Sequence, residues 1–519
     1  MTRGSRLTRG SLSLIGLGLA FAMAVSGCSS STAGGVATST APKVGGNLVV
    51  GITTDPDNLY PWKATQFQAV NVLQTLYGTL TEFDKDLNVV PGLAESWTYS
   101  SDNLTVTMKL RQGVKFADGS TFSSKDVKFS LDKIKDKTTA AVAASSLASV
   151  TSVEATDANT VTLKLSAPDA ALLANLASIN MAILASNATE EALKTTPNGT
   201  GPFVLKERKP SQSITVARNT AYWGDKTPLD SVEFRIIPDE TSIVSAMQSN
   251  NVQLAVLNDP LVAKTAQGGS LTVTKTPQLS YHVLQLNASR GVLSDVNVRL
   301  AMQCAIDRQQ VLDTAALGEG EVIGPITSPA YKSDPASRPC PTRDLAKAAD
   351  YLAKAGKSGG VTIKTIVSQG EYATSVAEAQ NLKAQLADAK ITLDLEVLAS
   401  NAYVDRWVAA DFDAAVALNG GRPDPDGMYG RYFTSTGNLN KVAGYSSPEL
   451  DSLFAAGRQS SDPATRKATY SKISDNLEAN AAWIWLFTGY TYTAASSKVS
   501  GYIPMANASV QYLRSTSLG

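Results

Sequence analysis

Alternating hydrophobic and polar positions mark strands along the chain. Over Leu104–Arg111, and again over Thr160–Leu165, every second residue is apolar and the residues between them are Thr, Lys or Arg. A period of two places one face of a strand against a core and the other toward water. We therefore expect half-buried antiparallel strands in this part of the chain.

Helical spacing alternates with these strands. The segment Ser123–Asp126 resembles a capping box before apolar residues spaced along one helical face. Pro168 predicts the start of a further helix, because proline is tolerated in a first turn. A strand over 232–236, a helix over 240–249 and a strand over 252–256 predict a β-α-β unit. The sequence indicates a mixed α/β protein.

The first residues follow another pattern. Three arginines precede a run of apolar residues over 12–25, which is too short and too rich in Gly and Ala for a stable membrane span. We interpret residues 1–27 as a signal peptide. The small residues before Cys28 resemble a lipobox, where the thiol is acylated and the signal is cut; an unmodified cysteine beside a conventional site is the alternative, but the Ala-x-Ala pattern is missing. Residues 28–44 are rich in Ser, Thr, Ala and Gly, which predicts a flexible tether.

Length and charge narrow the class of protein. A chain of 519 residues predicts two or three compact domains. Lys and Arg total 46, as do Asp and Glu, so no charge excess indicates nucleic acid as a partner. After the signal peptide no apolar run approaches the roughly 20 residues that a membrane-spanning helix needs. We expect a body that lies outside the membrane.

Residues with catalytic or metal-binding chemistry are sparse. The single histidine, His282, lies in the alternating segment 280–286, which favours an ordinary strand residue. No histidine or cysteine pairing with metal-ligand spacing, nucleophile elbow, phosphate loop or dinucleotide fingerprint is present. We therefore predict no catalytic residue, no metal and no cofactor. Cys304 and Cys340 would lie in an oxidising compartment and are predicted to form a disulfide, with two separate buried thiols as the alternative.

Several short motifs, in order along the chain, point to one family. The segments Pro91–Trp97 (PGLAESW), Leu110–Gly119 (LRQGVKFADG) and Ser124–Val127 (SKDV) closely resemble the signature of family 5 extracellular solute-binding proteins. These are the oligopeptide-, dipeptide- and nickel-binding proteins of ABC importers. Further matches in the same order are Gly45–Leu48, Leu59–Pro61, Gly199–Phe203, Tyr222–Trp223, Val298–Arg299, Ala305–Arg308 and Asp424–Asp426. The resemblance covers essentially the whole mature chain.

This resemblance implies an α/β, two-lobed periplasmic-binding-protein-like fold of type II, in its three-domain variant. Lobe 1 would comprise residues 45–77, 200–285 and 487–519, the domain inserted beside it 78–199, and lobe 2 residues 286–486. Two crossing strands would form a hinge, with the ligand cleft between the lobes.

The resemblance also implies a role and partners. The protein would be a monomer, lipid-anchored to the outer face of the cytoplasmic membrane, that delivers a small molecule or peptide to an ABC permease and ATPase complex. A ligand sensor, a chaperone or a hydrolytic enzyme on the same scaffold are the alternatives, since a fold does not fix a function.

The specificity segment departs from the peptide-binding pattern. Peptide-binding members hold the ligand's free amine with an aspartate shortly before an Asp-Pro pair. Here that position holds Gly421 or Arg422, depending on where one gap is placed, and Asn419 occupies a nearby aromatic position. The amine anchor is missing at this position, so a sugar or an acidic ligand is an option beside a peptide; the alternative is that Asp424 or Asp426 reaches in from a shifted loop. Nickel is disfavoured because the single histidine lies elsewhere.

Arg422 has two interpretations. Its guanidinium can pair with a carboxylate or with hydroxyl groups of a ligand. Alternatively it points outward, or pairs with Asp424 or Asp426 to brace the loop. By alignment, the candidate ligand-binding residues are Trp62, Phe67, Asn258, Gln285, Tyr403, Asn419, Gly420, Gly421, Arg422 and Trp485. For the aromatic candidates, ordinary core packing is the alternative.

Overall fold

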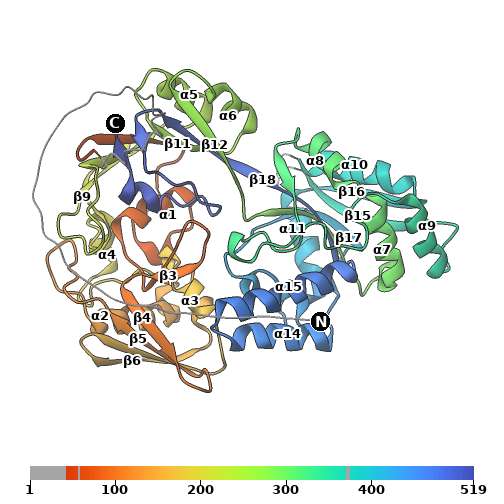
Figure 1. Cartoon of the computed structure of the whole chain (residues 1–519), viewed down its shortest axis with the longest axis horizontal. Coiled ribbons are helices and arrows are strands. Elements are labelled where there is room, and N and C mark those ends of the chain that lie inside the picture. Colours follow the sequence, from red (N-terminus) through yellow and green to blue (C-terminus); the bar gives the residue numbers. More distant parts are fainter. Residues whose placement is uncertain (1–42, 57–58, 370–373) are drawn as a thin grey trace, which may run out of the picture. The chain divides into compact units, whose positions relative to one another are not determined.

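A twelve-stranded sheet joins strands from the beginning, middle and end of the chain in the computed structural model, which describes residues 43–56, 59–369 and 374–519. Its main path runs β16-β15-β17-β13-β18-β11-β1-β10-β9-β8, and β12 and β14 pair with β18 beside it (Figure 1). The signal peptide, Cys28 and nearly all of the tether predicted from the sequence lie outside the described residues. The mixed α/β class predicted from the sequence is confirmed.

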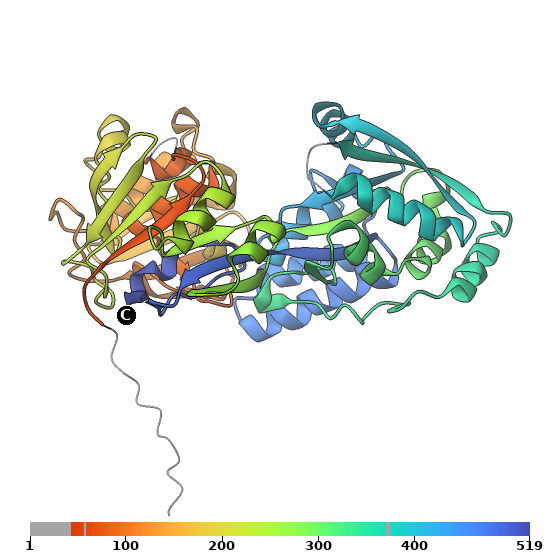
Figure 2. The ribbon, with the colours of Figure 1, turned by 90° about the horizontal axis from the view of Figure 1, so that it is seen from above.

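The strand β18 (Trp483–Ser496) belongs to two half-sheets. Its first residues pair with β13 (Tyr281–Leu286), and its last residues pair with β11 (Leu254–Leu257) and β12 (Leu271–Pro277). The chain therefore passes between the half-sheets twice, in β18 and in the segment that joins β12 to β13, as Figure 2 shows. Separate hydrophobic cores form on the two half-sheets.

The first half-sheet surrounds β1 (Asn47–Ile52), which pairs in parallel with both β10 (Ser231–Ile236) and β11. The helix α5 (Glu240–Gln248) connects β10 to β11 and buries Ile243, Val244 and Met247. The predicted β-α-β unit is therefore confirmed, with β1 inserted between its two strands. This half also contains β8 (Phe203–Lys209), β9 (Ser213–Arg218), α1 (Phe67–Leu76) and α6 (Pro260–Ala266).

The segment between α1 and β8 carries a four-stranded antiparallel sheet, β4-β5-β7-β6. Its strands are β4 (Ala94–Tyr99), β5 (Thr105–Leu110), β6 (Val150–Asp157) and β7 (Thr160–Leu165). Ser123 and Asp126 form the predicted capping box of α2 (Ser124–Lys135). The same segment holds α4 (Glu190–Thr195) and the short pair β2 (Thr81–Phe83) and β3 (Val89–Pro91).

The helix predicted to begin at Pro168 was placed too early. The structure has only a short helix, α3 (Leu172–Asn175), in this segment. Asp169 instead accepts a hydrogen bond from the Ser149 hydroxyl at 2.6 Å, and the Ala170 N–H donates to the Arg458 carbonyl at 2.9 Å. These tertiary contacts replace the first helical turn.

The second half-sheet contains β13, β14 (Gly320–Val322), β15 (Val361–Gln369), β16 (Ile391–Ala399) and β17 (Ala414–Asn419). Its helices are α7 (Val296–Ala305), α8 (Arg308–Ala315), α9 (Leu345–Lys354), α10 (Ser375–Ala387), α11 (Ser400–Ala409), α12 (Arg431–Phe433), α13 (Asn440–Ala443), α14 (Pro448–Gln459) and α15 (Pro463–Ala479). A disulfide joins Cys304, near the end of α7, to Cys340. The chain ends in a short pair, β19 (Val499–Ser500) and β20 (Ser517–Leu518).

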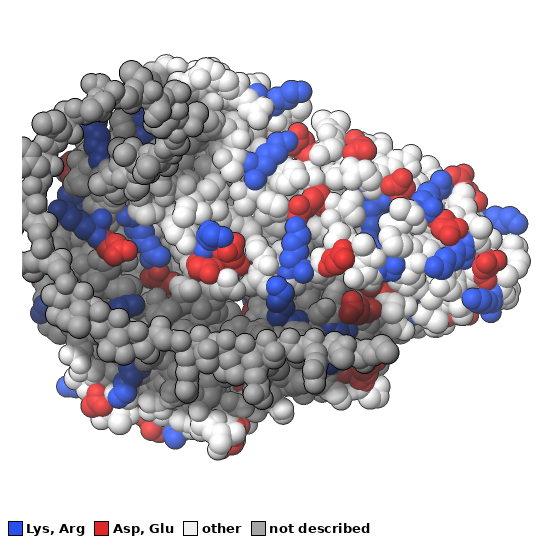
Figure 3. All heavy atoms as spheres, in the orientation of Figure 1, with Lys and Arg blue, Asp and Glu red and all other residues white. Residues whose placement is uncertain are grey.

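His282 lies on β13 as expected for a strand residue, where its imidazole stacks on Phe487 and its Nδ1 lies 2.8 Å from Glu378 Oε1. Within the described ranges, no group of three or more His, Cys, Asp or Glu side chains is arranged to hold a metal ion. In the same part of the chain, no helix has the length and apolar character to cross a membrane. Figure 3 shows basic and acidic side chains intermixed on the visible described surface, in line with the balanced charge.

Candidate functional site

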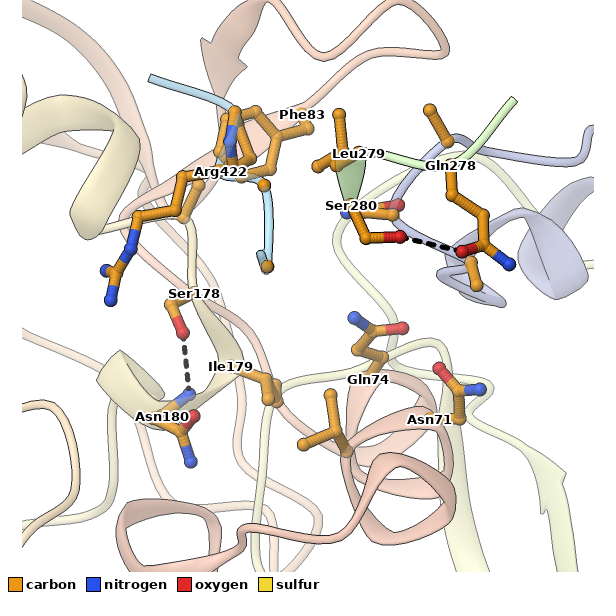
Figure 4. Close-up of a pocket in the computed structure, with 18 of the residues that line it drawn as sticks. Asn71, Gln74, Phe83, Ser178, Ile179, Asn180, Gln278, Leu279, Ser280 and Arg422 are labelled. Atoms are coloured by element: carbon orange, nitrogen blue, oxygen red, sulfur yellow. Dashed lines mark hydrogen bonds between the residues drawn. The ribbon is translucent and has the colours of Figure 1, made fainter. Parts of the chain in front are cut away.

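A pocket of about 970 Å³ lies where the two half-sheets exchange strands. Its walls come from segments far apart in the sequence: α1, the residues that follow α3, the segment between β12 and β13, the loop after β17, and the stretch after β19. Figure 4 shows Asn71 and Gln74 of α1 in one wall and Arg422 in another. Because both half-sheets contribute to the pocket, a bound molecule would contact both.

The lining is polar and carries almost no charge. Carboxamide side chains are its most frequent polar group: Gln66, Gln68, Asn71, Gln74, Asn175, Asn180, Asn258, Gln278, Asn507 and Gln511. Hydroxyl groups come from Thr53, Thr54, Ser146, Ser178, Ser280 and Thr491. Of the described lining residues, only Arg422 and Asp424 are charged and only Phe83 is aromatic. The pocket therefore suits a polar molecule with many hydrogen-bonding groups.

The helix α1 presents carboxamides and Val70 to the pocket, while its other apolar residues pack in the core. Val72 and Leu73 are fully buried in the core, whereas Asn71 and Gln74, one turn apart, line the pocket. Gln74 accepts a hydrogen bond from the Ser509 hydroxyl at 2.8 Å. The side-chain oxygen of Asn71 is buried and has no hydrogen-bond partner among the described residues. A buried polar atom of this kind is costly unless a ligand or water satisfies it.

The crossing segment between β12 and β13 is held in place by hydrogen bonds. Ser280 donates to Gln278 Oε1 at 2.7 Å, the contact drawn in Figure 4, and Gln278 donates to the Tyr490 carbonyl at 3.1 Å. The Thr488 hydroxyl reaches the carbonyls of Gln278 and Ser280 at 2.9 and 2.6 Å. The two passages between the half-sheets are thus tied together at the wall of the pocket.

The loop after β17 approaches the crossing segment so closely that Gly421 has no room for a side chain. A Cβ at Gly421 would lie 1.8 Å from the carbonyl oxygen of Leu279, whereas one at Gly420 would meet nothing within 4 Å. In this backbone conformation an aspartate cannot occupy position 421. If position 421 is the anchor position, the path of the backbone itself excludes the aspartate.

Arg422 lines the pocket, but its side chain is also exposed to solvent, as one of the sequence-based alternatives expected. It forms no hydrogen bond or ion pair with any residue in the described parts of the chain. Burial by the pocket walls, and then the nearby Arg431 guanidinium, lower the pKa of Arg422 from its ordinary value. Arg431 lies over the Tyr432 ring, 4.7 Å from its centroid, and its Nε is buried without a hydrogen-bond partner among the described residues. Two neighbouring positive charges thus lack a compensating anion.

The carboxylates next to Arg422 are paired with other arginines. Asp424 is buried and lies 2.8 Å from an Nη of Arg466 on α15, while Asp426 lies 3.4 Å from Nε of Arg458 on α14. Burial raises the pKa of Asp426 to about 6, with Arg458 opposing the shift. The sequence-based alternative in which Arg422 braces Asp424 or Asp426 does not hold in this structure.

The structure brings together four of the candidates named from the sequence: Asn258, Gly420, Gly421 and Arg422 line the pocket. Trp62, Gln285, Tyr403, Asn419 and Trp485 do not line it, and the side chain of Phe67 is outside the description. Trp62 donates its indole N–H to the Ala182 carbonyl at 2.9 Å, and Trp485 donates to the Tyr429 hydroxyl at 2.9 Å. Both tryptophans are core residues whose polar atom is satisfied inside the protein.

The other three are also held by internal contacts. Gln285 is fully buried and accepts a hydrogen bond from the Trp407 indole at 2.6 Å. The Tyr403 hydroxyl donates to the Val416 carbonyl at 2.9 Å, and Asn419 donates to the Tyr281 hydroxyl at 3.2 Å. These side chains face the core of the second half-sheet. They stabilise the second half-sheet, from which the pocket loop extends, and do not line the pocket.

Sequence reasoning missed most of the carboxamides, including Asn71, Gln74, Asn180 and Gln278. Only one signal was available, which is that Gln68, Asn71 and Gln74 recur at one-turn spacing in a largely apolar helix. Most of the other carboxamides come from loops or very short helical turns, where polar residues are ordinary and carry no periodic pattern.

Comparisons with known proteins agree with this architecture. The profile of bacterial extracellular solute-binding proteins, family 5 (middle region), matches residues 88–440. The glutathione-binding protein GsiB of Escherichia coli O6:K15:H31 is 26% identical over 479 residues, which covers 88% of this chain and 91% of that protein.

Two solved structures share the fold. HbpA2 from Haemophilus parasuis superposes with a TM-score of 0.83 at 24% identity, over 91% of this chain and 100% of that one. The binding protein AgaA from A. tumefaciens R10, solved in complex with agropinic acid, gives a TM-score of 0.69 at 25% identity, over 91% of this chain and 99% of that one. The match to HbpA2 bears on the fold alone.

Proposed function

Because the chain belongs to family 5 of the bacterial extracellular solute-binding proteins, we propose that it captures a small polar solute in the pocket described above and hands it to the permease of an ABC importer. One observation carries this proposal: the pocket is lined by both half-sheets at the point where the chain crosses between them. A solute held there contacts both halves, so binding and relative movement of the halves are coupled.

The proposal defines two lobes. Residues 45–77, 200–285 and 487–519 form lobe 1 with the domain 78–199 beside it, and residues 286–486 form lobe 2. The hinge is the pair of passages tied by Thr488. The proposed solute contacts are Asn71, Gln74, Asn258, Gln278, Gly420, Gly421 and Arg422.

Native mass spectrometry of the freshly purified protein tests the receptor function. We expect a small molecule that stays bound in mild conditions and leaves unchanged when the protein is denatured. A chain that returns only chemically altered molecules would be acting as an enzyme, and a chain that neither co-purifies with nor supports uptake of any solute would contradict the proposal.

We also propose that the chain is anchored by a lipid on Cys28, which follows the signal peptide and precedes the tether. Cys28→Ala should move the protein from the membrane fraction to the soluble fraction. Detergent partitioning of the wild type and of Cys28→Ala measures this change. The same partitioning of both proteins would contradict a lipid anchor at Cys28.

A further inference from the structure

We infer, resting on the proposed function, that the solute carries a carboxylate and has no free ammonium group. Its remainder presents hydroxyl or amide groups. Three features of the pocket carry this inference: a guanidinium without an acidic partner among the described residues, the lack of an available carboxylate, and carboxamides as the most frequent polar groups of the lining.

The guanidinium of Arg422 selects the sign of the solute's charge. It lines the pocket, and no described acidic side chain pairs with it. Arg431, close enough to act on it electrostatically, also lacks an ion-pair partner in the described chain. A guanidinium offers a planar fork of donors that matches the two oxygens of a carboxylate. A solute carboxylate beside Arg422 would compensate the positive charge of these two guanidinium groups.

An ammonium group would find no available anionic partner in the described lining of the same pocket. The carboxylate of Asp424 is the only acidic group in the described lining, and it is 6% exposed and paired with Arg466 at 2.8 Å. Gly421 cannot be replaced by an acidic residue, since a Cβ there meets the Leu279 carbonyl. An ammonium brought into this space would lose its hydration beside two guanidinium groups, which is unfavourable. The pocket therefore rejects a free amine.

The carboxamides of the lining indicate which groups the rest of the solute carries. Each Asn or Gln side chain can both donate and accept hydrogen bonds, so it matches hydroxyl and amide groups in either sense. Asn71 is 4% exposed, and its side-chain oxygen is unsatisfied where it borders the pocket. This oxygen requires a donor, which a hydroxyl or an amide N–H supplies. Figure 4 shows Asn71 and Gln74 across the pocket from Arg422, so the acid and the donor groups belong at different ends of the solute.

The test uses one tripeptide, Ala-Ser-Ala, in three chemical forms. The first has an acetylated amine and a free carboxylate, the second an acetylated amine and an amidated carboxyl, and the third two free ends. Calorimetry on the whole mature chain should give the first form a roughly tenfold or greater advantage over the other two. Arg422→Gln should lower the affinity for the first form about tenfold and leave the second unchanged. Arg235→Gln, a partly exposed arginine outside the pocket, is the matched control and should have no effect.

Each other outcome overturns the inference. Equal or tighter binding of the free-ended or amidated form contradicts the assigned charge pattern. An equal loss for all forms in Arg422→Gln contradicts the role of the guanidinium, and no binding of any form contradicts the assigned class of solute. None of these results touches the receptor function, which stands or falls on the bound molecule found by native mass spectrometry.

Discussion

Two arginines flank the loop after β17, and their surroundings differ completely. Arg466 is 4% exposed and forms an ion pair with Asp424, while Arg422 extends into the pocket without any described partner. Arg466 is removed from water and has a protein anion to compensate its charge, whereas Arg422 is exposed and has no acidic partner among the described residues. The buried pair ties the loop to α15, and the exposed charge of Arg422 is the one that we propose is available to a solute.

The interior of the second half-sheet gives the same contrast. Arg338 and Glu478 are each about 1% exposed and lie 3.2 Å apart, far along the chain from the pocket loop. Neither side chain lines the pocket. Breaking a buried pair leaves an uncompensated charge inside the protein and destabilises the fold. Substituting a paired, buried arginine such as Arg466 should therefore lower the stability of the fold. Substituting Arg422 should instead lower the affinity for the solute.

The largest effect on stability is expected from breaking the buried ion pair between Arg466 and Asp424. Arg466→Met leaves the Asp424 carboxylate uncompensated, and the free energy of unfolding should fall by about 3–5 kcal/mol. Urea denaturation measures it. Asp424→Asn in the same chain should recover part of the loss, because it removes the orphaned charge. A change below about 1 kcal/mol would mean that the pair does not hold the loop.

The next effect concerns the close approach behind the pocket. Gly421→Ala places a Cβ against the Leu279 carbonyl, so the loop or the crossing segment must move, at a cost of about 1–3 kcal/mol. Gly420→Ala is the matched control, because a Cβ there meets open space. Thermal unfolding of the two variants should separate them clearly. Equal melting temperatures would show that the loop adapts freely.

A third effect, on the pH dependence of stability, is expected from Asp426, which is paired with Arg458. Its pKa in the folded protein is raised to about 6 from 3.8 by burial. The protonated form is therefore favoured by folding, and this contribution is fully present below about pH 4 and is lost as the pH rises through about 6. Asp426→Asn should gain up to about 3 kcal/mol on the wild type between about pH 4 and pH 8, because one pKa unit corresponds to about 1.4 kcal/mol. Urea titrations across that range measure the gain; parallel curves for both variants would contradict it.

Much of the fold was predictable from local pattern. The alternation over Thr160–Leu165 became β7, and the capping box at Ser123 begins α2, because both depend on neighbouring residues. The helix expected at Pro168 failed because Asp169 and Ala170 are held by Ser149 and Arg458, which lie elsewhere in the sequence. Periodicity does not contain such long-range contacts.

The site was predictable at Asn258, by alignment, and in the segment where the chain departs from its family pattern. The segment around Arg422 stood out because an aspartate was missing, and it lines the pocket. Trp62 and Trp485 were plausible as aromatic platforms, but their indole groups are satisfied in the core. Asn71 lies in α1 and Gln278 in the crossing segment, and only the fold brings both residues to the same pocket. Sequence alone does not tell which polar side chains share a cavity.

Thermal unfolding of the wild type and of Arg422→Gln, each with and without the acetylated Ala-Ser-Ala acid, tests the central claim most directly. The two empty proteins should unfold within about 0.5 kcal/mol of each other, because Arg422 has no described partner to lose. The probe should then stabilise the wild type and leave the variant nearly unchanged, since ligand that binds only the native state raises its stability. An empty variant as unstable as Arg466→Met, or equal stabilisation of both proteins by the probe, would contradict the account.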